Sequence, residues 1–324
     1  MIKQKKKGII KIGIIFAIIF VAIAVFVSSR YITKNVYATS LNNNQQTITD
    51  SKDNNTSNNS EVKDRDTLKN DIENEEATET IKGMDKIVYT PLSEDLNASD
   101  AKEVQDRLES WNFTRADNKK IAYLTFDDGP STTVTPQILD ILKKNNIKAT
   151  FFVLGSVVEE SDGAKEVLKQ MVKDGHAIGN HGYCHDYSKL YPNGVVDANA
   201  FINDMEKSEK ILQSVLGADF HTRVIRFPGG HGSWDTTSVN NILEQDGYTF
   251  IDWNTLSGDA ESNQTKTPAE LFDRVKATVT ELSGNNDVIV VLMHDKEGKE
   301  TTAESLQETI DYLKSQGYEF KTLK

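Results

Sequence analysis

The amino-acid sequence predicts an α/β fold in which about seven parallel strands form a distorted or incomplete (β/α) barrel. From residue 118 onward, short runs rich in β-branched and aromatic residues alternate with amphipathic helical stretches, an order typical of parallel βα units. Polar residues suited to acid–base or metal chemistry also fall at the ends of five of these runs. In parallel barrels the functional site gathers at the carboxyl ends of the strands. Both observations therefore indicate one domain over residues 118–324.

The expected elements of this domain follow from apolar periodicity. The predicted strands are Ile121–Phe126, Ala149–Leu154, Ala177–Asn180, Val224–Phe227, Tyr248–Trp253, Val288–Met293 and Tyr318–Leu323. Three of the helices between them show an apolar face at helical spacing. These faces consist of Phe201, Met205, Leu212 and Val215, of Leu271, Val275, Val279 and Leu282, and of Leu306, Ile310 and Leu313.

The region before this domain divides into two parts. Residues 86–117 are expected to be a helical segment that packs on the domain, because Ala101, Val104, Leu108 and Trp111 form one apolar stripe. Residues 30–85 are expected to be a disordered extracellular tether. Large apolar side chains are almost absent from residues 39–80, and such a stretch cannot bury enough apolar surface to offset its ordering entropy.

Residues 1–29 predict a cytoplasmic lysine cluster followed by a transmembrane signal-anchor. The 21 residues from Gly8 to Ser28 are apolar or small except for Lys11, which is close to the ~20 residues that cross a bilayer. The preceding lysines predict a cytoplasmic N-terminus. A single-pass protein of the cell membrane with an extracellular domain follows. The alternative is secretion after signal cleavage at Ala38, but ten residues separate Val27 from Ala38, which is long for a cleavage site.

Charge and cysteine content exclude some partners and some kinds of stabilisation. Five lysines lie in the first eleven residues, so the rest of the chain has a net charge of −12 − 5 = −17. No basic stripe is present to bind nucleic acid, and no required protein partner is evident. Cys184 is the single cysteine, so a hydrophobic core rather than an intramolecular disulfide must stabilise the fold.

Two motifs carry the candidate chemistry. Asp127 and Asp128 follow the first predicted strand in TFDDGP, and His181 and His185 stand four residues apart in HGYCH. A hydrolytic metal site needs such ligands, a spare carboxylate as base and an open position for water. Each motif alone is weak evidence, because adjacent aspartates before Gly-Pro usually form a turn and a His pair is more often solvated or packed.

Further polar residues end the later strands: Arg226 the fourth, Asp252 the fifth and His294 the sixth. Arg226 and Asp252 could equally be a structural ion pair. Because all of these residues fall at successive strand ends, we favour a shared site over unrelated structural roles.

Taken together, these residues resemble the NodB-homology domain of the polysaccharide deacetylases, carbohydrate esterase family four. The resemblance covers residues 118–324 and says nothing about residues 1–85. TFDDGP is an unbroken and highly specific match. The five motifs of the family correspond in order to Thr125–Pro130, His181–His185, Arg226–Gly230, Asp252–Trp253 and Leu292–His294.

The resemblance implies a metal site and a base. Asp128, His181 and His185 would bind a divalent metal, with Zn²⁺ expected first and Co²⁺ or Ni²⁺ as alternatives. Asp127 would take a proton from the attacking water. Arg226 would pair with Asp127 and favour its ionised form.

The resemblance also implies an acid and contacts to the substrate. His294 would protonate the departing amine, and Asp252 would orient His294 and raise its pKa. A backbone N–H in the Arg226–Gly230 turn, that of Gly229, would stabilise the oxyanion. Trp253 and Leu292 would wall a small apolar pocket for the acetyl methyl group.

Three positions depart from the family pattern. Gly182 stands where the family has Ser or Thr, and loss of a supporting hydroxyl would weaken metal binding. Cys184 lies between the two histidines and is interpreted as a small buried hydrophobe rather than a fourth ligand. Gly229 stands where the family often has a larger residue, which predicts a more open groove.

The motifs therefore predict hydrolytic removal of acetyl from a carbohydrate. The polar stretch of some forty residues over 39–80 spans ~35 Å as a random coil, enough to reach a cell wall, so N-acetylglucosamine of peptidoglycan is the expected substrate. N-acetylmuramic residues, exopolysaccharide, chitin oligomers and acetylxylan are alternatives. A catalytically silent NodB-like domain that binds glycan is a further alternative, although the expected ligands, base and acid are all present.

Overall fold

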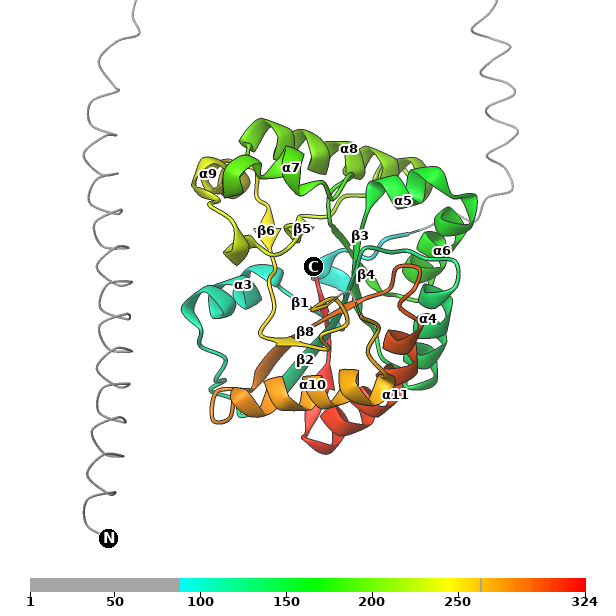
Figure 1. Ribbon diagram of the computed structural model, residues 1–324, viewed down its shortest axis with the longest axis vertical. Coiled ribbons are helices and arrows are strands. Elements are labelled where there is room, and N and C mark those ends of the chain that lie inside the picture. Colours follow the sequence, from blue (N-terminus) through cyan, green and yellow to red (C-terminus); the bar gives the residue numbers. More distant parts are fainter. Residues whose placement is uncertain (1–87, 263) are drawn as a thin grey trace, which may run out of the picture. The chain divides into compact units, whose positions relative to one another are not determined.

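The structure is a computed structural model that describes residues 88–262 and 264–324 (Figure 1). The expected anchor over residues 1–29 and the expected tether over residues 30–85 lie outside the described residues. Within the described ranges, no helix is both long enough and apolar enough to cross a membrane.

A parallel sheet forms the centre of the described domain. Its strands lie in the order β6-β5-β4-β3-β2-β8-β7, and β9 pairs with the first residues of β2. In the described part of the chain the edge strands β6 and β7 are not paired with each other, so the barrel is open, as expected. The strands are β2 (Lys120–Asp127), β3 (Thr150–Val153), β4 (Ala177–Asn180), β5 (Val224–Ile225), β6 (Thr249–Phe250), β7 (Thr255–Leu256), β8 (Val288–His294) and β9 (Tyr318–Phe320).

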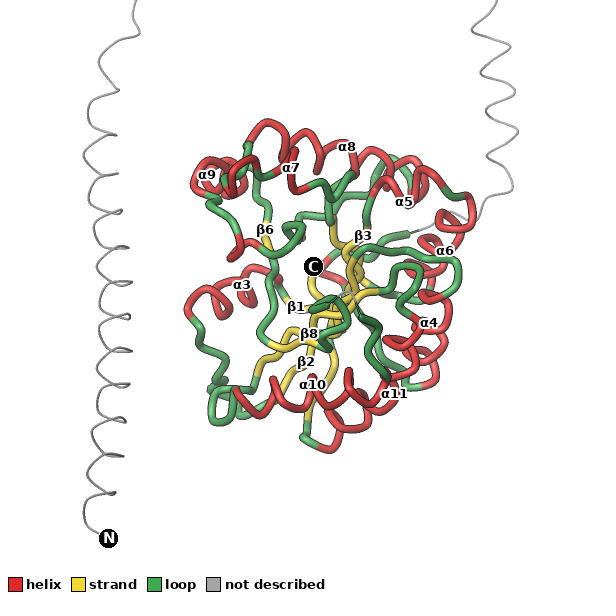
Figure 2. The backbone as a smooth tube through the Cα atoms, viewed as in Figure 1, coloured by secondary structure: helices red, strands yellow, loops and turns green. Residues whose placement is uncertain are grey.

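Helices surround the strands, as Figures 1 and 2 show. The predicted apolar faces on α8, α10 and α11 point into the core, where most of their residues are buried. The helices are α3 (Ala101–Ser110), α4 (Val134–Lys144), α5 (Gly155–Glu160), α6 (Asp162–Lys173), α7 (Tyr187–Leu190), α8 (Ala198–Leu216), α9 (Thr237–Gln245), α10 (Pro268–Glu281) and α11 (Glu300–Ser315). Short 3-10 turns occupy Leu92–Glu94, Pro192–Gly194 and His231–Ser233.

Each of the seven predicted runs contains a strand, with two differences. The last run divides into β9 and β10 (Thr322–Leu323), and β10 pairs with β1 (Ala98–Ser99) in a separate two-stranded sheet. The second difference is β7, which the sequence did not predict. It has two residues and lies in a polar stretch, so it is too short to show the period-two pattern of a strand.

The segment before β2 packs on the domain through α3 and the residues that follow it. Ala101, Val104 and Phe113 are buried in the same apolar cluster as β2 and β8. The expected place of Trp111 in the apolar stripe is wrong. The helix ends at Ser110, and Trp111 adopts a left-handed conformation with φ 52° and is 59% exposed.

A second, smaller apolar cluster lies beneath α7, α8 and the turn after β5. It supports the loop that carries the two histidines, because Cys184 of that loop packs against it. Its buried members are Leu190, Tyr191, Val196, Phe201, Met205, Ile225, Phe227, Val239 and Leu243.

Candidate active site

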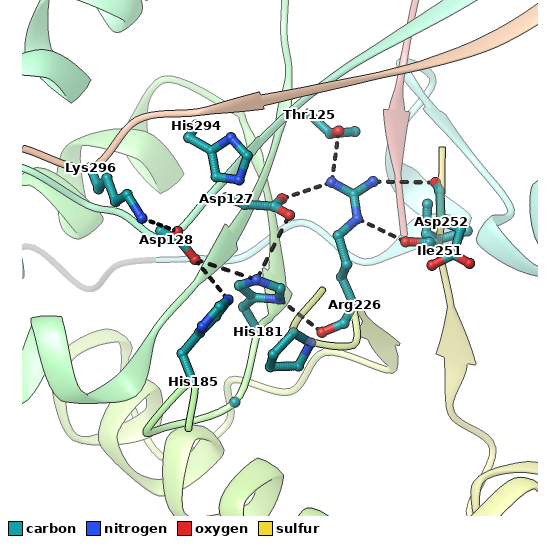
Figure 3. A network of polar contacts seen from close by, with 12 residues as sticks. Thr125, Asp127, Asp128, His181, His185, Arg226, Ile251, Asp252, His294 and Lys296 are labelled. Carbon is teal, nitrogen blue, oxygen red and sulfur yellow. Dashed lines mark hydrogen bonds and ion pairs between the residues drawn. The ribbon is translucent and has the colours of Figure 1, made fainter. Parts of the chain in front are cut away.

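The predicted site residues meet at the carboxyl edge of the sheet. Asp127 ends β2 and His294 ends β8, and the two are partners in the parallel register of these strands. His181 follows β4 and Arg226 follows β5. Figure 3 shows these side chains converging on one region. The alternation of strands and helices therefore suffices to bring the motifs together.

Asp128, His181 and His185 form a cluster whose ligand atoms lie within 4.8 Å of one another. Asp128 Oδ1 lies 3.4 Å from Nε2 of each histidine. This oxygen is buried and has no hydrogen-bond partner. His181 Nδ1 donates to the Arg226 carbonyl at 2.8 Å, so the lone pair of its Nε2 faces the carboxylate. A buried anionic oxygen opposite such a lone pair is the arrangement that a bound cation stabilises, and the residues therefore fit a divalent metal.

The protonation states of the cluster suit a metal as well. Burial lowers the pKa of His185, which favours the neutral imidazole that a metal requires. Burial alone would raise the pKa of Asp128, but the neighbouring His181, His185 and His294 outweigh it and hold that pKa far below its usual range. Asp128 also has φ 71°, an uncommon left-handed conformation that the surrounding fold must hold in place.

Arg226 and Asp127 form a buried ion pair, as expected from the resemblance. Arg226 is fully buried, and its Nη1 donates to Asp127 Oδ1 at 2.7 Å and to Thr125 Oγ1 at 2.9 Å. Its Nε donates to the Ile251 carbonyl at 2.8 Å. Asp127 Oδ2 lies 3.7 Å from His181 Nε2. One oxygen of Asp127 is thus fixed by the arginine, and the other faces the metal-ligand cluster.

Thr125 is a supporting residue that sequence reasoning did not single out. Its buried hydroxyl donates to the Val291 carbonyl at 2.7 Å and accepts from Arg226. The sequence feature that could have identified it is its position at the start of TFDDGP. Thr125 lies two residues before Asp127, so both side chains point to the same face of β2.

The turn after β5 presents a backbone donor. Gly230 N–H donates to the Phe227 carbonyl at 2.8 Å, with Pro228 and Gly229 as the central residues. Gly229 has φ 80°, the conformation that glycine adopts at this position of a type II turn. In the described residues the Gly229 N–H has no acceptor within bonding distance, so it is available to a ligand.

The expected pairing of Asp252 with His294 is wrong. The Asp252 carboxylate accepts from the backbone N–H groups of His231 at 2.8 Å and Gly232 at 3.1 Å. Asp252 follows β6, which lies at the opposite end of the strand order from β7, the neighbour of β8. Asp252 thus fixes the chain just after the Gly229 turn and does not bond to the histidine.

Asp259 is the partner of His294. Its Oδ1 accepts from His294 Nδ1 at 2.8 Å, and its Oδ2 accepts from the His294 N–H at 2.8 Å and from Thr302 Oγ1 at 2.9 Å. Burial alone would lower the pKa of His294, but the hydrogen bond and charge of Asp259, with the charges of Asp127 and Asp128, raise it above its ordinary value. His294 is thereby held as a proton donor with Nε2 directed away from Asp259.

The role of Asp259 as the partner of His294 could not be predicted from the sequence for two reasons. Asp259 follows β7, the two-residue strand that the sequence did not reveal. It is followed by Ala260, so the only Asp-Trp pair in this stretch of the sequence was Asp252–Trp253.

The loop between the two histidines is closed by Asp204 of α8. The Asp204 carboxylate accepts from the N–H groups of Tyr183 at 2.7 Å and Cys184 at 3.2 Å. Gly182 has φ 82°, and a Cβ there would lie 2.5 Å from Asp204 Oδ2. A side chain at position 182 would therefore clash with the Asp204 carboxylate that holds this loop. Cys184 is half-buried against the second apolar cluster and lies outside the metal-ligand group.

The residues expected to wall the acetyl pocket lie near this turn and on β8. A Cβ at Gly230 would lie 2.8 Å from Cη2 of Trp253, so the Trp253 ring packs directly on the turn. Leu292 is half-buried and precedes His294 by two residues, which places both on one face of β8.

The groove at Gly229 is not more open, contrary to expectation. A Cβ at this position would lie 3.0 Å from the Tyr187 hydroxyl and 3.2 Å from Cζ2 of Trp234. These two aromatic side chains therefore fill the space that a larger residue would take. Tyr187 is 44% exposed, and its ring centroid lies 5.2 Å from that of His185.

Comparisons with known proteins agree with one another. The family described as polysaccharide deacetylase matches residues 114–251. The peptidoglycan-N-acetylglucosamine deacetylase PgdA of Listeria monocytogenes is 38% identical over 207 residues, which cover 64% of this chain and 38% of that protein. A peptidoglycan-N-acetylglucosamine deacetylase of Bacillus cereus is 32% identical over 222 residues, which cover 66% of this chain and 70% of its own. The structure of a Streptococcus mutans CE4 esterase superposes with a TM-score of 0.63 at 35% identity and covers 70% of this chain and 92% of the esterase.

Proposed function

Because this chain belongs to the polysaccharide deacetylase family, we propose that it hydrolyses the acetamide of N-acetylglucosamine in a cell-surface polysaccharide, with peptidoglycan as the substrate. One observation carries this proposal. A cluster of three metal-type ligands lies beside a buried Asp127–Arg226 pair and a His294–Asp259 pair. These are the ligands, base and acid that amide hydrolysis requires.

Asp128, His181 and His185 would hold the metal, and Zn²⁺ is the ion we propose, because a catalytic zinc site has three protein ligands and an open position. Such an ion, when bound, lowers the pKa of water and polarises a carbonyl oxygen. Co²⁺ and Ni²⁺ suit the same set of one carboxylate and two imidazoles.

Asp127 would accept a proton from the attacking water. Arg226 holds Oδ1 of this carboxylate, so Oδ2 is the oxygen that faces the ligand cluster. The water oxygen then bonds to the acetyl carbon, and the Gly229 N–H is placed to donate to the oxygen that becomes negative. The rigid turn costs no reorganisation when that charge develops.

His294 would donate its proton to the sugar nitrogen as the carbon–nitrogen bond breaks. The hydrogen bond and charge of Asp259 raise the pKa of His294 and so favour the protonated form. The amine and acetic acid are released, Asp127 then returns its proton to solvent, and His294 takes a proton from solvent. Trp253 and Leu292 would border the methyl group of the acetyl, since both are apolar, partly exposed and close to the turn or to His294.

The choice of peptidoglycan is supported by the names of the relatives and by the sequence before residue 88. The Listeria and Bacillus cereus relatives are described as peptidoglycan-N-acetylglucosamine deacetylases, although the chain spans 38% of the Listeria protein's length. We further propose that residues 1–29 anchor the protein in the cell membrane and that residues 30–85 let the domain reach the wall. Recovery of the protein in the soluble extracellular fraction, with Ala38 or the following residue as its N-terminus, would contradict the anchor.

The experiment is mass spectrometry of glycan fragments from isolated peptidoglycan treated with the zinc-loaded full-length protein, with Asp127→Asn as the matched control. We expect loss of acetyl from glucosamine with the wild type and none with the variant. Unchanged acetylation with the wild type, on peptidoglycan as well as on chitin oligomers, exopolysaccharide and acetylxylan, would contradict deacetylase activity. Activity on one of the other glycans alone would contradict the choice of peptidoglycan.

A further inference from the structure

The two oxygens of Asp128 face different partners. Oδ1 is directed toward the two histidines and has no hydrogen-bond partner. Oδ2 accepts a hydrogen bond from Lys296 Nζ at 2.8 Å. Figure 3 shows the lysine reaching Asp128 from the side opposite Arg226. The Asp128 side chain is 6% exposed, whereas that of Lys296 is 46% exposed, so a solvated ammonium contacts a buried carboxylate.

The loop that carries Lys296 is fixed on both sides of it. Just before it, the Asp295 N–H donates to the Asp127 carbonyl at 3.1 Å. Just after it, Glu297 Oε1 accepts from the Thr132 N–H at 2.8 Å, and Lys299 Nζ donates to the Asp259 carbonyl. Lys296 therefore approaches Asp128 from a defined position between two anchored neighbours.

We propose that Lys296 is a positioning residue that occupies the second oxygen of Asp128 and so restricts this carboxylate to a one-oxygen metal ligand. Carboxylates bind metals through one or both oxygens. A carboxylate that binds with both would take a coordination position that the attacking water or the acetyl oxygen needs. This inference rests on the proposed function, since it concerns the metal of that same site.

A second consequence is electrostatic. The ammonium of Lys296 opposes the approach of a divalent cation, so the site binds its metal less tightly than it would without the lysine. Asp128 lies on a left-handed backbone and its side chain is buried, so it should stay beside the histidines without Lys296. The lysine affects only which of the two carboxylate oxygens can bind the metal. Removing the lysine should therefore strengthen metal binding and at the same time slow turnover.

This pair of opposite changes separates the proposal from a merely structural role. A lysine that only held the loop in place would, when removed, weaken metal binding and turnover together. Arg at position 296 keeps the charge and the hydrogen bond, whereas Met keeps the length and loses both.

The test is the affinity of the full-length protein for Zn²⁺, measured by competition with a chromophoric chelator, together with kcat at saturating Zn²⁺. For Lys296→Met we expect affinity to rise on the order of tenfold because the repulsion between the ammonium and the cation is removed, which is about 1.4 kcal/mol, and kcat to fall. Lys296→Arg should stay within about twofold of the wild type in affinity. Lys314→Met is the control for net charge, because Lys314 lies at the far end of α11 and bonds to Asn145.

Zinc affinity that is unchanged or weaker in Lys296→Met would overturn the proposal, and so would tighter binding with undiminished kcat. If the wild type itself binds no Zn²⁺, and Asp128→Asn behaves in the same way, the proposed function and this inference both fail.

Discussion

The two sides of the site are assembled in different ways. The metal side, consisting of Asp128, His181 and His185, comes from two short segments of the chain, and each segment carries its ligands within five residues. The proton-transfer side, consisting of Asp127, Arg226, His294 and Asp259, draws its members from the ends of β2, β5, β8 and β7. The metal side is local in sequence, and the proton-transfer side exists only once the sheet has formed.

The two sides differ in how the charges of their carboxylates are balanced. On the metal side the buried Oδ1 of Asp128 has no hydrogen-bond partner among the described residues. On the proton-transfer side each carboxylate already has its partner, Arg226 for Asp127 and His294 for Asp259. Substitutions on the two sides should therefore separate metal binding from proton transfer.

The largest expected effect comes from Asp127→Asn. The amide keeps the shape but cannot accept the proton, so kcat should fall by about 10²- to 10⁴-fold. Metal content, measured by mass spectrometry of the purified protein, should stay at the wild-type level, because Asp127 is outside the ligand cluster. Asp128→Asn is the matched variant on the metal side and should lose the metal. If both variants lost the metal alike, the two sides would not be separable.

The next effect is a shift in the pH dependence of kcat. His294 must be protonated to act, so activity falls as pH rises through its pKa, which Asp259 raises. Asp259→Asn removes the charge that raises it, so the alkaline limb should move to lower pH and activity near neutral pH should fall. Zinc affinity should change little.

Asp252→Asn is the control for this shift. The Asp252 carboxylate accepts hydrogen bonds from the chain after the Gly229 turn and not from His294. Asp252→Asn should therefore lower kcat by the same factor at every pH and leave the alkaline limb of the pH profile at its wild-type position. If the alkaline limb shifted in Asp252→Asn and did not shift in Asp259→Asn, Asp252 would be the partner of His294, as the sequence predicted.

The sequence predicted the metal side and most of the fold because their signals are local. Alternating strands and helices, TFDDGP and HGYCH can each be recognised within a short window. Asp259 could not be predicted, because its role depends on β7 lying beside β8, and a two-residue strand leaves no periodic signal. Asp204 was missed for a similar reason, since it closes the histidine loop from a helix twenty residues further along the chain.

A smaller effect is expected at the Gly182–Asp204 contact. Asp204→Ala frees two N–H groups of the loop between the histidines, and zinc affinity should fall roughly tenfold. Gly182→Ser should also weaken binding, because its Cβ would meet the Asp204 carboxylate in a left-handed backbone. Chelator competition measures both.

The double variant Gly182→Ser with Asp204→Ala sharpens this test. The clash is then gone and a hydroxyl stands near the freed N–H groups, so the loss of affinity should be smaller than the sum of the two single losses. Strictly additive losses would show that the two residues act independently.

The smallest expected effect lies at the rim of the metal side. Tyr187 is partly exposed, and its ring packs at 5.1 Å on Trp234, which is itself stacked on Tyr191 at 4.3 Å. A fixed aromatic face beside His185 offers an apolar surface to a sugar ring. Tyr187→Ala should raise KM for glycan about fivefold, which corresponds to ~1 kcal/mol of lost apolar contact, with kcat and zinc affinity unchanged.

Tyr312→Ala is the control for loss of an aromatic ring, because Tyr312 packs on Phe272 on the outer helices. Its KM should equal that of the wild type. If Tyr187→Ala lowered zinc affinity instead of raising KM, Tyr187 would act through His185 as a support of the metal side. Tyr187 would then hold His185 in place, and other exposed side chains near the site would have to bind the glycan.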